Sequence, residues 1–243
     1  AIVMNKKAIQ KAAKRIRPYV IETPLLYSPF LSKEADAKVY LKLESEQITG
    51  SFKIRGAFNK LLSLSLRERK RGIITASTGN HGAAVAYGMQ KLRMKGTIYL
   101  PNNASTPKIE SIRYYGSDIK FYGDESVDTE IHAREIATKE NKVFISPYND
   151  PEIIAGQGTV GLEIFNRLPN IDVILVPVGG GGLIAGIASY AKQENRHVKI
   201  FGCEPKASAV MSASIGAGEV LHMKTYPTLS NATAGGLESG STT

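Results

Sequence analysis

From residue 72 onward, short apolar segments alternate with segments of helical periodicity, and this alternation constrains the fold more than any other feature of the sequence. The segments that we expect to be strands are 73–76, 97–100, 118–122 and 143–146, and those that we expect to be helices are 79–92, 105–115 and 125–140. A second series has a helix from about 155, a strand at 173–178, a helix at 183–193 and a strand at 198–203. Strands separated by helices in this way predict an α/β protein with parallel sheets.

The two series of strands predict two lobes, each an open, mostly parallel sheet flanked by helices. The first series places a smaller lobe at residues 67–147. The larger lobe combines residues 1–66 with 148–243, because a helix at 5–17 and a strand at 39–43 precede the first series. Clefts between lobes are where ligands usually bind.

The chain has 243 residues and a net charge of +9, which raises the question of a nucleic-acid or membrane partner. Basic clusters at 6–17 and 67–71 are typical of solvated helix faces, and no aromatic side chain is interleaved with the first cluster to stack on bases. The longest uncharged stretch, 173–191, contains Pro177 and four consecutive glycines, which do not suit a membrane-spanning helix. We therefore expect no nucleic-acid and no membrane partner. Without a visible secretory signal, and with one cysteine in the chain, the sequence favours a cytoplasmic protein.

Lys53 is the first candidate site residue, in the string Ser-Phe-Lys-Ile-Arg-Gly-Ala at 51–57. We expect a helix that opens at Ser51 and runs to about Leu64, which places Lys53 in its first turn. The positive end of the helix dipole and partial burial would both lower the pKa of the amine. A neutral lysine is a nucleophile for carbonyl groups and can form a Schiff base. Position alone fits an ordinary surface lysine better.

A polar turn at 77–82, Ser-Thr-Gly-Asn-His-Gly, joins the strand at 73–76 to the following helix. Free backbone N–H groups at a helix start bind anions such as carboxylate, and short polar side chains add hydrogen-bond donors. A capped turn without function has the same pattern. No second histidine lies at ligand spacing from His81, so we expect a packed or hydrogen-bonded histidine rather than a metal ligand.

Four consecutive glycines and a leucine connect the strand at 173–178 to the next helix: Gly179, Gly180, Gly181, Gly182 and Leu183. A backbone cradle for phosphate explains these glycines better than packing does, since each glycine has an entropic cost. The spacing Gly180-x-Gly182-x-x-Ala185, with Glu204 at the end of the next strand, also fits a dinucleotide fingerprint. An NAD(P)-binding oxidoreductase is therefore an alternative of a different class, although it gives the first two sites no role.

Together, these motifs resemble those of fold-type II pyridoxal-phosphate enzymes. Residues 41–44 and 50–57 are similar to the cofactor-lysine motif, 77–82 to the substrate-carboxylate loop and 179–183 to the phosphate loop, and 156–159 also match. The motifs keep the family's order over nearly the whole chain. The resemblance is to serine/threonine dehydratases (threonine ammonia-lyases) and serine racemases, and it implies the tryptophan synthase β-like fold of two lobes.

The resemblance implies a role for each motif. Lys53 would hold pyridoxal 5′-phosphate as a Schiff base and act as the base at the substrate α-carbon, Phe52 would pack beside the ring, Asn80 would bind the ring hydroxyl, and Gly179, Gly180, Gly181, Gly182 and Leu183 would bind the phosphate. The substrate carboxylate would be held by Ser77, Thr78, Gly79, Asn80 and His81. Thr78 matches the serine that serves racemase-like members as an acid/base, so it is a second catalytic candidate.

The implied reaction is β-elimination of a small hydroxy amino acid, such as L-threonine or L-serine, to a 2-oxo acid and ammonia. Serine racemisation, or dehydration of another hydroxy amino acid, is the alternative within the family. Both anion-binding loops lack arginine, which favours a substrate with a neutral side chain. The resemblance also suggests a homodimer.

The chain departs from the family pattern at two places. Family members continue past position 243 and place a serine or cysteine against the pyridine nitrogen there, so we expect this chain to lack the family's C-terminal segment and its larger lobe to be incomplete. The racemase-type cation site has a glutamate followed six residues later by an aspartate. Glu204 matches, but position 210 is valine, so we expect no metal site. We expect Cys203 to be a buried strand residue rather than a nucleophile.

Overall fold

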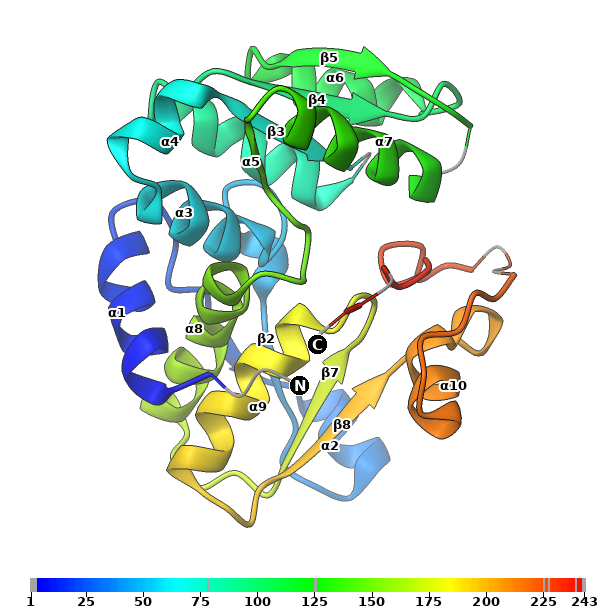
Figure 1. Cartoon of the computed structure of the whole chain (residues 1–243). Helices are drawn as coiled ribbons and strands as arrows, with labels where there is room; N and C mark the ends of the chain where they lie inside the picture. Colours follow the sequence, from blue (N-terminus) through cyan, green and yellow to red (C-terminus); the bar gives the residue numbers. More distant parts are fainter. Residues whose placement is uncertain are drawn as a thin grey trace.

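The computed structural model describes residues 4–77, 79–124, 126–224, 226, 228–238 and 240–241 (Figure 1). Its α-helices are α1 (Lys6–Ile16), α2 (Pro29–Ala35), α3 (Lys53–Ser63), α4 (Leu66–Arg71), α5 (Asn80–Lys91), α6 (Thr106–Tyr114), α7 (Ser126–Lys139), α8 (Pro151–Arg167), α9 (Gly182–Glu194) and α10 (Val210–Ala217). Its strands are β1 (Leu25–Tyr27), β2 (Tyr40–Lys42), β3 (Ile73–Ala76), β4 (Gly96–Leu100), β5 (Asp118–Phe121), β6 (Val143–Phe144), β7 (Val173–Pro177) and β8 (Lys199–Cys203). Short 3₁₀ turns occupy η1 (Glu44–Glu46) and η2 (Lys206–Ser208).

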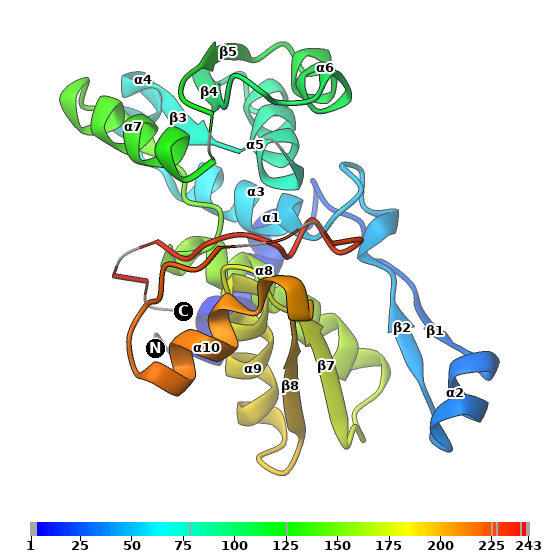
Figure 2. The ribbon, with the colours of Figure 1, turned by 90° about the vertical axis from the view of Figure 1, so that its right-hand side faces the viewer.

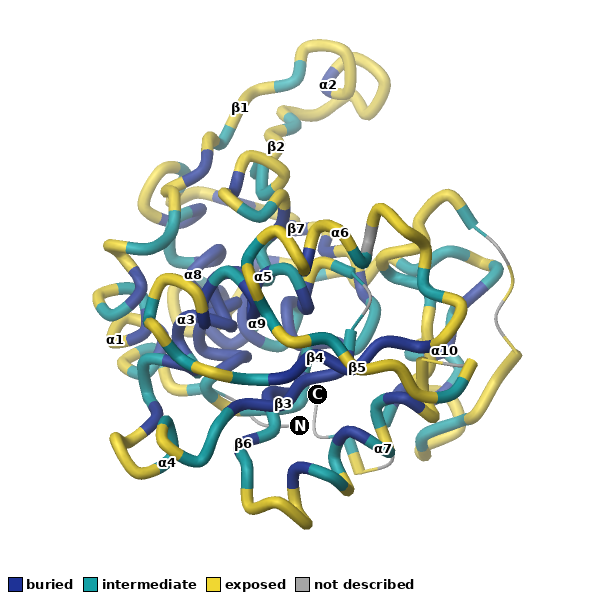
Figure 3. The backbone as a smooth tube through the Cα atoms, turned by 90° about the horizontal axis from the view of Figure 1, so that it is seen from above, coloured by how far each residue is buried: buried dark blue, intermediate teal, exposed yellow. Residues whose placement is uncertain are grey.

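Four parallel strands form one sheet, in the order β5-β4-β3-β6. Successive residues of β3 point to opposite faces and are buried on both. Ile73 joins the core shared with α3 and α5, whereas Ile74 packs with Ala133 and Ala137 of α7. Because helices cover both faces, β3 and β4 are mostly apolar, and Figure 3 shows them buried. Their threonines, Thr75 and Thr97, are buried as well.

Two further parallel strands, β7 and β8, form a second sheet with one covered face. Ile174 and Val176 of β7 pack against the core that includes α8 and α9, whereas Val173 and Leu175 point outward and are exposed. The alternation of buried and exposed residues in β7 follows from the period of two in a strand.

Three helices cross at small residues between the two sheets. A Cβ atom on Gly156 of α8 would lie 2.6 Å from the Cα atom of Gly56 in α3, and one on Gly158 would lie 3.0 Å from the carbonyl oxygen of Gly186 in α9. Larger residues would push these helices apart. The match at 156–159 therefore has a packing role, which brings the starts of α3 and α9 toward one site.

The two parallel-sheet units flanked by helices agree with the predicted fold class. The proposed division of the chain at 66/67 and 147/148 stays a prediction, because one hydrophobic core runs from Ile16 and Ile153 through α3 to the first sheet. Among the described residues, no helix is long and apolar enough to cross a membrane.

Several expectations about single elements were wrong. Helix α8 begins at Pro151 rather than near 155, because the side chain of Asp150 caps it by accepting from the N–H groups of Glu152 and Ile153. Cys203 is exposed rather than buried, since it lies on β8 beside the uncovered face. Strand β2 lies within the strand expected at 39–43, but β1, α2 and the antiparallel pairing of β1 with β2 were not predicted. The pair projects from the molecule in Figure 2.

Candidate active site

Lys53 is the first residue of α3, and its amine is withdrawn from solvent although the residue as a whole is half-buried. The amine donates a hydrogen bond to the carbonyl oxygen of Pro147 at 2.7 Å and lies 5.4 Å from the ring centroid of Phe52. Burial lowers the pKa of Lys53 to about 8, against the opposing negative charge of Glu130. Part of the amine is therefore uncharged near neutral pH, as a nucleophile requires. Ser51 was expected to cap the helix, but the N-cap position is Phe52.

The glycine bend 179–182 lies beside the same segment, because Tyr148 follows Pro147. A Cβ atom on Gly180 would overlap three atoms of the Tyr148 ring, and one on Gly182 would lie 3.0 Å from the Tyr148 carbonyl oxygen. Gly181 has a φ of 88°, which is left-handed and favours glycine. Three of the four glycines thus have a structural reason, which corrects the view that packing does not explain them. The N-cap residue of α9 is Gly181, which has no side chain that could accept hydrogen bonds from the first turn. The start of α9 therefore presents backbone N–H groups.

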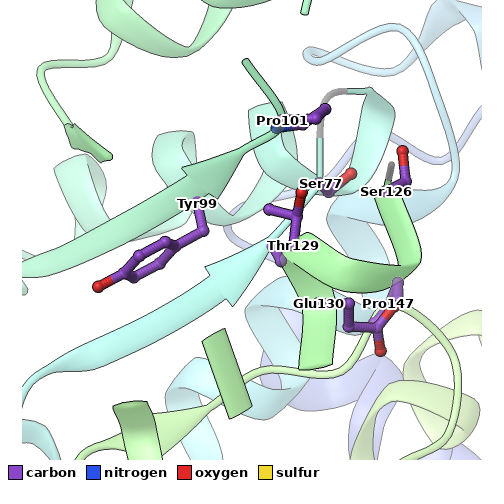
Figure 4. Close-up of a pocket in the computed structure, with 8 residues that line it drawn as sticks. Ser77, Tyr99, Pro101, Ser126, Thr129, Glu130 and Pro147 are labelled. Atoms are coloured by element: carbon purple, nitrogen blue, oxygen red, sulfur yellow. The ribbon is translucent and has the colours of Figure 1, made fainter. Parts of the chain in front are cut away.

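Pro147 also lines a cavity of about 160 Å³ (Figure 4). Its lining residues come from the ends of β3 and β4, from the start of α7 and from the segment before α8: Ala76, Ser77, Tyr99, Pro101, Ser126, Thr129, Glu130 and Pro147. Pro147 lines this cavity and also accepts the hydrogen bond from Lys53, so the cavity and the lysine belong to one site.

The predicted carboxylate turn reaches this cavity through Ser77. Gly79 is the N-cap residue of α5, and Asn80 is exposed at the first helical position, so the turn presents backbone N–H groups at a helix start. The His81 side chain points elsewhere: it is 2% exposed and contacts Thr75 and Ile145. Thr78 lies outside the described residues.

Comparisons with known proteins agree with this geometry. The family described as "Pyridoxal-phosphate dependent enzyme" matches residues 16–243. The chain belongs to that family. It is 42% identical over 226 residues to the L-threonine ammonia-lyase of Thermotoga maritima, covering 93% of this chain and 56% of that protein. It is 39% identical over 223 residues to the catabolic L-threonine dehydratase TdcB of Escherichia coli K12, covering 92% of this chain and 68% of that protein.

Solved structures show the same relationship. The structure of maize serine racemase has a TM-score of 0.92 at 34% identity and covers 98% of this chain and 72% of that chain. The processed form of threonine deaminase isoform 2 from Solanum lycopersicum has a TM-score of 0.90 at 36% identity, covering 96% and 65%. The prediction of a fold-type II pyridoxal-phosphate enzyme is confirmed, and the chain spans little more than half to about three quarters of the length of these relatives.

The residues present fit the family's cofactor. A lysine amine with a lowered pKa, an aromatic ring beside it and a helix start made of glycine meet around Pro147 and Tyr148. An aldehyde can attach to this amine, and the free N–H groups of a helix start suit a phosphate.

Four residues of the site have no signal in the sequence. Glu130 of α7 accepts a hydrogen bond from Arg134 at 2.9 Å, and burial raises the pKa of its carboxyl group, against the effect of Arg134. Arg134 also pairs with Glu238. The Glu238 N–H donates to the Tyr148 hydroxyl at 2.6 Å. Figure 2 shows the segment that carries Glu238, in red, crossing between the first sheet and α8.

Arg55 is a buried cation two residues after Lys53. Its guanidinium is 0% exposed and pairs with Glu44 at 2.7 Å and with Glu163 of α8 at 2.6 Å. Lys42 joins the network through Glu163. Arg55 holds the pKa of Glu44 below its ordinary value, although burial alone would raise it. The network fixes the first turn of α3, and so the start of the Lys53 side chain, against β2, η1 and α8.

Glu204 matches both the ribose-binding acid of a dinucleotide fingerprint and one ligand of a racemase-type cation site, but the structure gives it a different role. Its carboxylate accepts hydrogen bonds from the Met211 N–H at 2.9 Å, the Ser212 N–H at 2.8 Å and the Ser212 hydroxyl at 2.7 Å, so it caps the start of α10. These bonds leave it poorly placed to bind a ribose. Within the described part of the chain, no group of three His, Cys, Asp or Glu side chains could hold a metal ion.

Proposed function

We propose that the protein is a pyridoxal-phosphate-dependent ammonia-lyase that eliminates water from a small hydroxy amino acid, with L-threonine and L-serine as the substrates tested first. The products are a 2-oxo acid and ammonia. The observation that carries the proposal is the single hydrogen bond from Lys53 to Pro147, since Pro147 lines the substrate cavity and its neighbour Tyr148 rests on the glycine bend. Similarity to an L-threonine ammonia-lyase supports this choice of reaction.

The cofactor would be held at both ends. Lys53 would bind its aldehyde covalently, and the backbone at 179–183 would bind its phosphate. Phe52 would pack beside the ring and Asn80 would bind the ring hydroxyl. When bound, the cofactor supplies an electron sink for negative charge at the substrate α-carbon.

The chain's own residues would bind the substrate and move the protons. The turn 77–81 would hold the carboxylate through backbone N–H groups at the start of α5. Lys53, with a pKa of about 8, would accept the proton from the α-carbon, because a base near its working pH is the most effective. Thr78 is the proposed acid/base on the side of the substrate α-carbon opposite to Lys53.

A small, neutral side chain suits the cavity. Ser77, Ser126 and Thr129 contribute hydroxyl-bearing residues to its lining. Arg134, one helical turn beyond Glu130, is paired with two carboxylates and so is not available to bind an acidic substrate. Hydroxy amino acids with a neutral side chain are therefore preferred over an acidic one such as hydroxyaspartate.

Of the two alternative functions, one is supported by a structural likeness and the other is opposed by the findings above. Serine racemisation is a second candidate because of the likeness to the maize serine racemase structure. An NAD(P)-dependent oxidoreductase is opposed by the family membership and by the capping role of Glu204. A homodimer and a cytoplasmic location remain proposals.

The test has two parts. Treatment with pyridoxal 5′-phosphate and borohydride should leave a phosphopyridoxyl group on Lys53, located by mass spectrometry, and the loaded chain should release 2-oxo acid from L-threonine or L-serine. Lys53→Ala should abolish both results, and Lys14→Ala, at an exposed site on α1, should change neither. D-serine is measured in the same samples. Labelling spread over other lysines, with none on Lys53, would reject the proposal.

A further inference from the structure

His81 has a buried side chain that joins two segments of the candidate site, and the mechanism proposed above uses only its backbone. The residue lies in the first turn of α5. Its Nε2 atom is 3.1 Å from Thr75 Oγ1 and 3.2 Å from the carbonyl oxygen of Ile145. Ile145 comes two residues before Pro147, whose carbonyl oxygen accepts the hydrogen bond from Lys53. The imidazole therefore connects the turn 77–81 to the segment 145–147, which contacts the amine of Lys53.

The hydrogen-bond partners determine where the ring proton lies. A carbonyl oxygen only accepts hydrogen bonds, so Nε2 must donate to Ile145. The Thr75 hydroxyl donates its own hydrogen to the same carbonyl at 2.7 Å, which leaves its oxygen to accept from Nε2. In the neutral ring Nδ1 then holds the lone pair, and Nδ1 has no hydrogen-bond partner among the described residues.

The ring is expected to stay neutral at physiological pH. Burial, and then the positive charge of Lys53, lower the pKa of His81 to about 3, against the hydrogen bond to Ile145. A side chain that is 2% exposed does not reach the cavity as an acid or a base. The task left to it is to hold the backbone in place.

We propose that His81 is a positioning residue, whose neutral Nε2–H imidazole fixes the carboxylate-binding turn relative to Lys53. The inference rests on the proposed function, in which the turn 77–81 binds the substrate carboxylate. The contact between Gly82 and Ser77 closes the turn tightly, since a Cβ atom on Gly82 would overlap the Ser77 carbonyl oxygen. Without the imidazole the whole turn can shift relative to Lys53, whereas the lysine and the glycine bend keep their own contacts with Pro147 and Tyr148.

The ring proton can be located without substrate or cofactor. The chain has four histidines, and nitrogen-15 NMR of their imidazoles, with His81→Gln for assignment, reads the tautomer of each. We expect His81 to carry its proton on Nε2 and to show no titration between pH 5 and 8. A proton on Nδ1, or a midpoint near the ordinary value of about 6.5, would overturn the proposal.

The positioning role is tested with two variants of the cofactor-loaded chain. His81→Gln keeps an N–H donor near the place of Nε2, and His81→Leu fills the space without a donor. Because one hydrogen bond changes an equilibrium by roughly tenfold, we expect His81→Leu to raise the KM for the amino acid about tenfold. We expect His81→Gln to raise it less than about threefold, and the affinity for pyridoxal 5′-phosphate to stay within about twofold in both.

The outcomes separate this inference from the proposed function. A chain that never binds the cofactor through Lys53 rejects the function, while the NMR result still decides the state of His81. An unchanged KM in His81→Leu, or equal impairment in both variants, rejects the positioning role. If His81→Leu does not fold, a KM of His81→Gln raised by tenfold or more rejects the role, and a KM near that of the unmutated chain, together with the expected tautomer, supports it.

Discussion

The ring of Tyr148 packs directly against the backbone of Gly180, at a place where any Cβ atom would overlap the ring. The carbonyl oxygen of the neighbouring residue, Pro147, accepts a hydrogen bond from the amine of Lys53. One short segment between β6 and α8 therefore contacts both the lysine and the glycine bend. The spacing of the two proposed cofactor contacts depends on this segment.

Replacing Gly180 by alanine should destabilise the chain, because the added methyl group must displace the Tyr148 ring. Overpacking of a buried site costs about 1–3 kcal/mol, and we expect a loss of this size in the free energy of unfolding, measured with urea on the cofactor-free chain. Gly216→Ala is the matched control, since nothing lies within 4 Å of its Cβ position in α10. There alanine should be neutral or slightly stabilising. Equal stability of the two variants would contradict the packing described here.

Lys53 should react with aldehydes at a lower pH than the exposed lysines. Only the uncharged amine attacks a carbonyl group, so the rate of reductive labelling should rise with pH through a midpoint near its pKa of about 8. The exposed Lys14 on α1 gives the reference curve. Peptide mass spectrometry after brief labelling between about pH 6 and 11 gives the curves of both lysines. A Lys53 curve that coincides with that of Lys14 would rule out its desolvation.

The same shift predicts a stability effect of known sign. The folded-state pKa of Lys53 is lower than its unfolded value, so between about 8 and 10.4 the unfolded chain binds more protons. The contribution of Lys53 to the free energy of unfolding should therefore rise with pH over this window. Comparing the cofactor-free chain with Lys53→Met isolates this contribution, and a difference between the two that is constant with pH would count against it.

Much of the fold could be predicted from local patterns. Strands buried on both faces are mostly apolar, as at β3 and β4, and the helices between them have a clear period. Their bounds therefore fall within a few residues of those expected. Strand β2 lies within the strand expected at 39–43, whereas the three residues of β1 include exposed apolar side chains and have no distinctive pattern. Cys203 was judged by its place in a strand, and the sequence does not show which strand face lacks a cover.

The site was predictable only in part. Lys53, the polar turn and the glycine bend are contiguous motifs, and the structure brings them around Pro147. Tyr148, Glu130, Arg134 and Glu238 come from separate segments and meet only in the folded chain. Each has an ordinary sequence setting, and nothing local shows that Tyr148 would fill the space above Gly180.

Removing Arg55 should be strongly destabilising. Arg55→Ala leaves Glu44 and Glu163 near each other without the buried cation that compensates both. Breaking a buried pair in this way costs about 3–5 kcal/mol, measured as the free energy of unfolding in urea. Arg167→Ala is the control, because its pair with Glu22 is exposed and should be worth less than about 1 kcal/mol. Similar losses in both variants would show that the Arg55 network does not stabilise α3.

Glu204 should act as a helix cap rather than as a cation ligand. Glu204→Ala removes the acceptor for the first N–H groups of α10 and should lower the free energy of unfolding by about 1 kcal/mol, whereas Glu219→Ala, at an exposed position beyond the same helix, should not. A ligand that binds only the folded chain stabilises it by mass action. Millimolar Mg²⁺ or Ca²⁺ should therefore shift the unfolding midpoint equally in the unmutated chain and in Glu204→Ala. A cation-dependent gain that disappears in Glu204→Ala would instead assign the carboxylate to a metal site.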